Sequence, residues 1–345
     1  MEALGAGADR PWRALASFTV LVAVLTVAAA EAVLRIGAVQ ELLPPPEPYY
    51  HTLVDRKERL LERTLRDAGG IDVLFVGTSA VIADFDPTTF DAERGKTGPA
   101  PPSFNGGLPG MAPGLARLYL ERFYLPRNRP AALFHGVRAQ ELVMAPEPRD
   151  IPILGRIERG WLSDAPWRDR AGLLLTRTSA LVYYAGLPSL VVRRRRTSDL
   201  DPALLGWLPY PGEMSADPTM GLPSWMADPV WDMRPGRQAL RRSAGLAREA
   251  GIPFALVVLP EHPSLWATDR TRAGYAAFLA ELDALARDEG VYLLDVTEGD
   301  LGYYGQNHLF FDRSHLSPRG ARRFSAELAR LWERVRLEER GGGLP

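Results

Sequence analysis

Two short segments far apart in the sequence carry residue types that can act together in acyl transfer. Gly77-Thr78-Ser79 directly follows an apolar run at residues 71–76, and Asp312-Arg313-Ser314-His315 lies near the C-terminus. A serine hydroxyl is a weak nucleophile until a neighbouring base accepts its proton, and histidine is the commonest such base. With a spacing of three residues, a turn can bring the Asp312 carboxylate against one nitrogen of the His315 ring and leave the other nitrogen for a nucleophile.

Each segment also has a simpler interpretation when it is taken alone. Ser79 can be the N-cap of a helix, since serine is strongly preferred at that position. Asp312 can cap a turn, with His315 as an ordinary polar residue on the surface. Only a fold that brings the two segments together gives them a joint chemistry.

Apolar runs separated by helical patterns predict the element that would position Ser79. Such runs occupy residues 71–76, 131–134, 254–259 and 291–296, and each suits a strand that is covered on both faces. Strands that alternate with helices predict a parallel α/β sheet with helices on both faces. Ser79 then lies at the carboxyl edge of the first strand, where open α/β sheets bind their ligands.

Helical signals flank both segments. Residues 54–66 are charged, with leucines at helical spacing, and predict a surface helix. After His315, Ser317 is a good N-cap and Pro318 a good first residue of a helix, so Asp312 and His315 fall in a loop just before it. The apolar face of that last helix consists of Phe324, Leu328, Leu331 and Val335.

An apolar stretch near the N-terminus predicts a membrane anchor. Residues 14–30 contain no charge, and the apolar character continues to Leu34 with only Glu31 interrupting, which is long enough for a helix to span a bilayer. We favour an uncleaved anchor over a cleaved signal peptide, whose cleavage site the alanines at 28–30 partly imitate. More arginines precede the span than follow it, which favours a cytoplasmic N-terminus and an extracytoplasmic domain.

Three motifs together resemble those of the SGNH/GDSL hydrolase superfamily, in that family's order. They are Gly77-Thr78-Ser79, then Asn105-Gly106-Gly107-Leu108-Pro109-Gly110 in the next loop, and Asp312-Arg313-Ser314-His315 before the last helix. The likeness covers roughly residues 71–335. It implies a flavodoxin-like parallel sheet of about five strands with helices on both faces, the SGNH hydrolase fold, here preceded by one transmembrane helix. An anchor before such a domain is similar to the branch that serves cell-envelope acylation, including alginate O-acetylation proteins and the D-alanyl transfer protein of teichoic acid synthesis.

The resemblance implies a role for each residue of the candidate site. Ser79 is the expected nucleophile, His315 the general base and Asp312 the group that holds the histidine tautomer. The backbone N–H groups of Ser79 and Gly110 are the expected oxyanion hole for the tetrahedral intermediate.

The chain departs from the family pattern in two motifs. Thr78 stands where the family usually has aspartate, and the third motif falls at residues 135–138, His-Gly-Val-Arg, without the asparagine that the family uses as a further oxyanion donor. Arg138 is instead a candidate substrate contact, together with Asn105 of the second motif and His262, which follows another strand.

These signals predict a linear organisation. It comprises a cytoplasmic N-terminus at 1–13, an anchor at 14–34, a linker and surface helix at 35–70, the hydrolase-like domain at 71–335 with an insertion at about 150–235, and a disordered tail at 336–345. Within the insertion, residues 171–192 are rather apolar and favour a helix packed on the domain, with a second membrane span as the alternative. Four arginines at 193–196 suit a solvated helix end, or else a membrane-surface or partner-docking role.

Composition removes several classes of function. Acidic and basic residues nearly cancel, at 42 against 41, so charge gives no argument for nucleic acid as a partner. The chain has no cysteine, which excludes disulfides, thiolate metal sites and a cysteine nucleophile. No histidine pattern suggests a metal site, and no glycine-rich loop suggests a nucleotide cofactor, so we expect neither a metal nor a cofactor.

The expected function is that of a membrane-anchored serine esterase or O-acyltransferase. Its expected substrate is an ester, such as an O-acetyl group, on a glycan of the cell envelope. The expected partners are the lipid bilayer, that glycan and a membrane-bound O-acyltransferase. The alternative is a catalytically degenerate SGNH domain that only binds glycan or such an acyltransferase.

Overall fold

A computed structural model describes residues 10–37, 39, 49–95, 101–143, 167–183, 200–214, 231–300 and 304–340. The chain divides into two compact units. The smaller unit comprises Met1–Thr52 and Arg156–Ser198, and the larger unit comprises Leu53–Gly155 and Asp199–Pro345.

The larger unit is built on a parallel sheet of five strands in the order β2-β1-β3-β4-β5. The strands are β1 (Val73–Val76), β2 (Phe104–Asn105), β3 (Ala132–Val137), β4 (Phe254–Val258) and β5 (Tyr292–Leu294). This is the flavodoxin-like strand order, and the predicted parallel α/β sheet is confirmed. We did not predict β2, which pairs with β1 by only two residues and falls in a segment that we interpreted as a loop.

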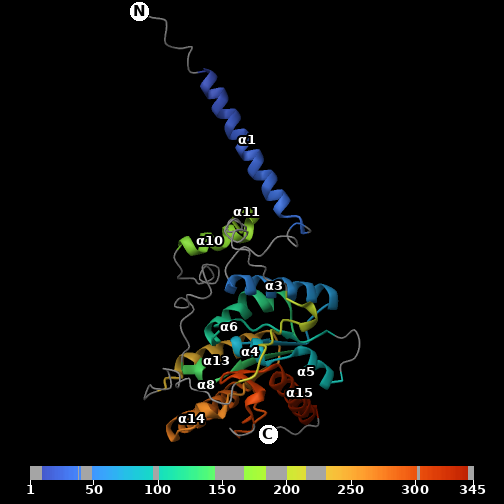
Figure 1. Ribbon diagram of the computed structural model, residues 1–345, viewed down its shortest axis with the longest axis vertical. Coiled ribbons are helices and arrows are strands. Elements are labelled where there is room, and N and C mark those ends of the chain that lie inside the picture. The colour runs from blue at the N-terminus through green and yellow to red at the C-terminus, as the bar shows by residue number, and fades with distance from the viewer. Residues whose placement is uncertain are drawn as a thin grey trace, which may run out of the picture. The chain divides into compact units, whose positions relative to one another are not determined.

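Both faces of the sheet are covered. Val73 and Phe75 of β1 belong to a hydrophobic core that also contains Phe324 and Leu328 of the last helix. Side chains alternate along a strand, so Leu74 must point to the opposite face, and it is buried as well. Helices α6 and α15 lie on opposite sides of the sheet (Figure 1).

Helices connect the strands as the alternating pattern predicts. They are α3 (Tyr49–Ala68), α4 (Ser79–Asp84), α5 (Pro87–Glu93), α6 (Pro113–Tyr119), α7 (Leu125–Arg127), α8 (Ala139–Val143), α13 (Arg234–Glu249), α14 (Asp269–Glu289) and α15 (Pro318–Arg340), with short turns η1 (Leu120–Tyr124), η4 (Pro202–Leu204), η6 (Pro263–Trp266) and η7 (Asn307–Leu309). A separate two-stranded hairpin joins β6 (Phe310–Asp312) to β7 (His315–Leu316).

The two helices expected on either side of the domain form, with changes at their ends. Ser317 caps α15 as predicted, since its hydroxyl accepts a hydrogen bond from the Gly320 amide. That helix continues to Arg340, so the predicted tail at 336–345 begins with helical residues. Helix α3 is more than a surface helix, because Lys57 on it is fully buried.

The predicted insertion at 150–235 is not one piece. Residues from Asp199 onward belong to the larger unit, where Trp207 lies in the core and donates a hydrogen bond to the Ala83 carbonyl. Residues 156–198 belong to the smaller unit instead. Prolines and glycines interrupt any periodic pattern in this region, so the sequence did not predict which residues belong to which unit.

The smaller unit contains α1 (Arg10–Leu34), α10 (Trp167–Thr178) and α11 (Ala180–Tyr183). Among the described residues, Ala14–Leu34 is the one helical segment long and apolar enough to cross a membrane. The helix expected to pack on the hydrolase-like domain, α10, falls in the unit of α1. Helix α10 ends at Thr178 and α11 begins at Ala180, and the rest of the alternative second span, residues 184–192, lies outside the described residues. The arginines at 193–196 lie outside the described residues.

Candidate active site

The nucleophile candidate lies at a sharp turn between β1 and α4. Gly77 has φ +148°, a backbone conformation that side chains other than glycine rarely adopt. Thr78 is the N-cap of α4, and its hydroxyl accepts a hydrogen bond from the Ala80 amide. Ser79 is therefore the first helical residue, and the simpler interpretation of Ser79 as the cap itself is wrong.

Three glycines fix the position of α4 through the side chain of Val81. A Cβ atom at Gly77 would lie 2.5 Å from Val81 Cγ2, and one at Gly136 would lie 2.4 Å from the same atom. A Cβ atom at Gly107 would lie 2.9 Å from Val81 Cγ1. Each distance is too short for a real contact, so only glycine lets Val81 pack here, two residues after Ser79.

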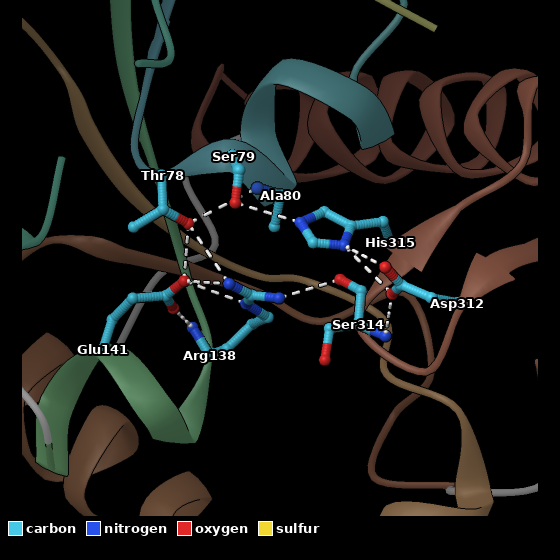
Figure 2. A network of polar contacts seen from close by, with 8 residues as sticks. All are labelled: Thr78, Ser79, Ala80, Arg138, Glu141, Asp312, Ser314 and His315. Atoms are coloured by element: carbon cyan, nitrogen blue, oxygen red, sulfur yellow. Dashed lines mark hydrogen bonds and ion pairs between the residues drawn. The ribbon is translucent and has the colours of Figure 1, made fainter. Parts of the chain in front are cut away.

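Ser79, His315 and Asp312 form a linear chain of contacts, although Ser79 and His315 are 236 residues apart (Figure 2). The distance from Ser79 Oγ to His315 Nε2 is 3.0 Å. His315 Nδ1 lies 2.9 Å from Asp312 Oδ2 and 3.0 Å from Oδ1. An ionised Asp312 accepts a hydrogen bond from a protonated Nδ1, which leaves the unprotonated Nε2 as the acceptor that faces the serine hydroxyl.

The charge of Asp312 is favoured by its surroundings. Partial burial would raise the pKa of Asp312, but the His315 ring and the backbone amide of Ser314 outweigh it and hold that pKa below its ordinary value. The Ser314 amide donates to Asp312 Oδ1 at 2.7 Å. The carboxylate therefore stays ionised, as a group that orients an imidazole must.

A hairpin brings Asp312 and His315 together, and the far end of α4 holds that hairpin. Asp312 in β6 is paired with His315 in β7 across the antiparallel strands. The amide of Leu316 donates to Asp84 Oδ1 at 2.7 Å, and Asp84 is the last residue of α4. Burial raises the pKa of Asp84 well above its ordinary value. One short helix thus carries Ser79 at its start and the hairpin's anchor at its end.

A second, buried network connects the two halves of the triad from below (Figure 2). Arg138 Nη1 donates to the Ser314 carbonyl at 2.8 Å, and Nη2 donates to the Thr78 hydroxyl at 3.3 Å. Glu141 pairs with Arg138 at 2.7 Å and accepts a hydrogen bond from the Thr78 hydroxyl at 2.6 Å. Arg138 therefore contacts the residue before Ser79 and the residue before His315.

Arg138 is the last residue of the third motif, from which the asparagine that the resemblance expects is absent. Its side chain is only 5% exposed and its three nitrogens make contacts within the protein. The structure thus places Arg138 beneath the triad, in contact with both of its halves, and its role as a substrate contact stays a prediction. Its sequence signal, a charged residue directly after a buried strand, does not distinguish these two places.

Asn105 and His262, the other two candidate substrate contacts, are also engaged within the protein. Asn105 is fully buried in β2, and its amide donates to the carbonyls of Val81 at 2.7 Å and Phe85 at 2.8 Å. His262 Nε2 lies 3.0 Å from Asn307 Oδ1. Both residues thus have partners within the protein, and their roles as substrate contacts stay predictions.

The loop that carries Gly110 runs beside the nucleophile turn. The Leu108 amide donates to the Gly77 carbonyl at 3.0 Å, which docks the loop against the residues before Ser79. Gly110 follows in a partly exposed turn with φ +69°. Ser79 is the first residue of α4, and the first N–H groups of a helix have no partner within the helix. The oxyanion role of both backbone N–H groups stays a prediction.

Tyr210 is a residue of the site that sequence reasoning missed. Its ring centroid lies 5.1 Å from that of His315 and 5.2 Å from that of Phe311, which is 38% exposed. The only sequence signal for a site residue here was the presence of aromatic residues in 199–214. This segment has no helical or strand periodicity, and it lies far in sequence from the motifs that contain Ser79 and His315. Tyr210 thus packs against the imidazole of His315.

Two buried titratable groups lie near the site without belonging to the triad. Burial raises the pKa of Glu261 to about 8, against the opposing charge of Arg138, and neither carboxyl oxygen of Glu261 has a hydrogen-bond partner within the described part of the chain. Burial lowers the pKa of His135 to about 3. Among the described residues, no cluster of three or more histidine, aspartate or glutamate side chains could hold a metal ion.

No family model matches the chain, and no curated protein matches it in sequence. The geometry of the site and the motifs that compose it are therefore what indicates a function.

Proposed function

We propose that the chain is a membrane-anchored serine esterase or O-acyltransferase with an SGNH-type site. The observation that carries the proposal is the 3.0 Å contact between Ser79 Oγ and His315 Nε2, with Asp312 behind the ring at 2.9 Å. A hydroxyl, an imidazole and a carboxylate in this order form the constellation of serine acyl-transfer enzymes. The position of Ser79 at the carboxyl edge of a parallel sheet agrees with it.

The proposed reaction has two half-reactions. Ser79 Oγ attacks the ester carbonyl while its proton passes to His315 Nε2, and that proton then protonates the departing alcohol oxygen. The serine ester that remains is attacked by water or by a second hydroxyl, whose proton passes to the same nitrogen. Collapse of the second tetrahedral intermediate restores the serine hydroxyl and releases the acyl group as an acid or as a new ester.

The proposed substrate is an ester, such as O-acetyl, on an extracytoplasmic glycan of the cell envelope. This step rests on the resemblance of the three motifs to the membrane-anchored SGNH branch and on the apolar helix Ala14–Leu34. We propose that the helix is a single span with the larger unit outside the cytoplasm. A membrane-bound O-acyltransferase is the proposed partner that would supply or receive acyl groups.

Ester hydrolysis by the full chain in detergent micelles tests the proposal directly. We expect p-nitrophenyl acetate hydrolysis by the natural chain, and loss of it in Ser79→Ala and His315→Ala. Ser314→Ala is the matched control, because its hydroxyl points away from the triad (Figure 2). A fluorophosphonate should label Ser79, as read by peptide mass spectrometry. Equal rates in the natural chain and in both triad variants would exclude the proposal that Ser79 and His315 catalyse ester hydrolysis.

The alternative is a catalytically degenerate domain that binds glycan or the acyltransferase partner. It is favoured by the missing asparagine in the third motif at residues 135–138. Loss of one oxyanion donor slows such enzymes by about two to three orders of magnitude, so a slow enzyme is still distinct from an inactive one. A folded natural chain with neither hydrolysis nor fluorophosphonate labelling would favour the alternative.

A further inference from the structure

Helices α10 and α11 of the smaller unit expose an unusual set of large apolar side chains. Exposed fractions are 70% for Trp167, 63% for Leu174, 50% for Leu175 and 43% for Val182. These four residues occupy a segment of only 17 positions, 167–183, within the described structure. Soluble surfaces rarely gather large apolar side chains in this way without a partner.

This segment is tied to the end of the apolar helix α1 through Glu31. The Glu31 carboxylate accepts hydrogen bonds from the Ala180 amide at 2.8 Å, the Leu181 amide at 2.9 Å and the Ser179 hydroxyl at 2.9 Å. Arg35 donates to the same carboxylate at 2.7 Å and also to the Thr178 carbonyl. Every one of these contacts lies within the smaller unit.

The position of Glu31 indicates the level at which this tie is made. It lies three residues before the end of the Ala14–Leu34 segment, which corresponds to roughly 4.5 Å along a helix. A carboxylate is costly in hydrocarbon and is found there with partners or near the interface. The donors from 179–181 and Arg35 satisfy Glu31 where the apolar stretch ends, so the segment 167–183 is tied to the end of the membrane span proposed above, on which the next step rests.

We propose that residues 167–183 form an interfacial membrane element, which lies on the bilayer surface and inserts Trp167, Leu174, Leu175 and Val182 among the lipid headgroups and upper acyl chains. Helix α10 has 12 residues, which is about 18 Å and too short to cross roughly 30 Å of hydrocarbon. Tryptophan and leucine on short helices are typical of such interfacial elements. The proposal is independent of the acyl chemistry and holds whether or not the chain is an enzyme.

Site-specific fluorescence quenching tests the proposal, and the absence of cysteine makes it clean because each introduced cysteine is the only label site. Leu174→Cys and Val182→Cys are labelled with the environment-sensitive dye NBD in the full chain, which is then placed in nanodiscs of phosphatidylcholine and phosphatidylglycerol. Lipids with a nitroxide near the headgroup or near the acyl-chain end serve as shallow and deep quenchers. We expect both labels to lose most of their fluorescence to the shallow nitroxide and less to the deep one.

Two matched labels give the scale. Leu21→Cys in the middle of the apolar helix should be quenched best by the deep nitroxide. Leu337→Cys in α15 is a leucine of almost the same exposure as Leu174, 64% against 63%, but in the larger unit, and should keep its fluorescence. Glu31→Ala should reduce quenching at Val182 and leave Leu21 unchanged, because it cuts the tie to α1.

Several results would overturn the proposal. Quenching at Leu174 and Val182 no stronger than at Leu337, with Leu21 quenched, would place the segment in water. Blue-shifted emission without quenching would mean that protein, and not lipid, covers these side chains. An unquenched Leu21 would remove the membrane anchor and the interfacial element together.

Discussion

The replacement of Arg138 by lysine tests how the two halves of the triad are held together. Lysine keeps the positive charge beside Glu141 but has one nitrogen in place of the guanidinium fork. The three donors of lysine radiate from one atom, so they cannot reproduce the contacts that Nε, Nη1 and Nη2 of Arg138 make at separate positions. The contact whose loss matters most is the 2.8 Å hydrogen bond from Nη1 to the Ser314 carbonyl, because it is the one that reaches the hairpin with Asp312 and His315.

The magnitude follows from that one contact. A hydrogen bond from a charged donor contributes about 1.5–3 kcal/mol. If the whole loss is added to the activation free energy, as the free energy needed to hold His315 against Ser79, kcat falls by about 10- to 100-fold. Each 1.4 kcal/mol of activation free energy is a factor of about ten in rate. Arg138 is 5% exposed and its guanidinium nitrogens donate to groups of the protein, so KM should stay unchanged. The pH profile should also keep its shape, because the titrating groups remain.

Arg94→Lys is the matched control. The Arg94 side chain is 4% exposed and pairs with Asp72 and Glu333, each at 2.6 Å, in contacts that do not involve the triad. It should lose similar stability in thermal or urea unfolding. Its kcat for p-nitrophenyl acetate should equal that of the natural chain.

The comparison of the two variants decides the question. Equal losses of stability with unchanged kcat in both would refute the positioning role of Arg138. Equal losses of kcat in both would attribute the effect to general loosening of the fold. Only a selective fall in kcat for Arg138→Lys, at unchanged KM, agrees with the geometry.

Three further predictions follow from contacts around the site. Gly136→Ala places a Cβ atom 2.4 Å from Val81 Cγ2 and should lower the free energy of unfolding by about 1–3 kcal/mol. Val81→Ala in the same chain should recover part of that loss, as measured by urea unfolding. If the effects of the two substitutions were additive, this steric explanation would be wrong. Glu261 has a pKa of about 8 in the fold against 4.5 ordinarily, so the folded state keeps a proton that the unfolded state has lost, and stability should decline between pH 5 and 8 by up to about 1.4 kcal/mol per pH unit. The difference in unfolding free energy between the natural chain and Glu261→Gln isolates this effect, and a pH-independent difference would rule it out. Tyr210→Ala removes a ring contact with His315 worth about 0.5–1.5 kcal/mol and should lower kcat by about two- to tenfold, with a smaller effect for Tyr210→Phe; the reverse order would show that the hydroxyl matters more than the ring.

Much of the fold was predictable because its signals are local. The apolar runs that became β1, β3, β4 and β5 are continuous in sequence, and the cap and first residue of α15 are readable from Ser317 and Pro318. Strand β2 was not, since two residues leave no pattern and only pairing with β1 defines them. The same limit hid the division of 150–235 between the two units, which depends on contacts far along the chain.

For the site, residue type was informative and residue burial was not. Ser79, Asp312 and His315 could be chosen because the motifs that hold them resemble a known pattern, and the structure brings their side chains together. Arg138, Asn105 and His262 were chosen because polar residues often follow buried strands at a ligand-binding edge. Whether such a side chain faces substrate or supports the site from within is decided by tertiary packing, as with Arg138 beneath the Ser314 carbonyl.

The sequence separation of 236 between Ser79 and His315 also determines when, during synthesis of the chain, the candidate site can form. Ser79 is added to the growing chain long before His315, so its hydroxyl has no His315 beside it while the residues between them are being made. A fragment that stops before the β6–β7 hairpin lacks His315, the proposed base, and we expect it to hydrolyse no ester. In the proposed enzyme, reactivity therefore arises only once the chain has been made through His315.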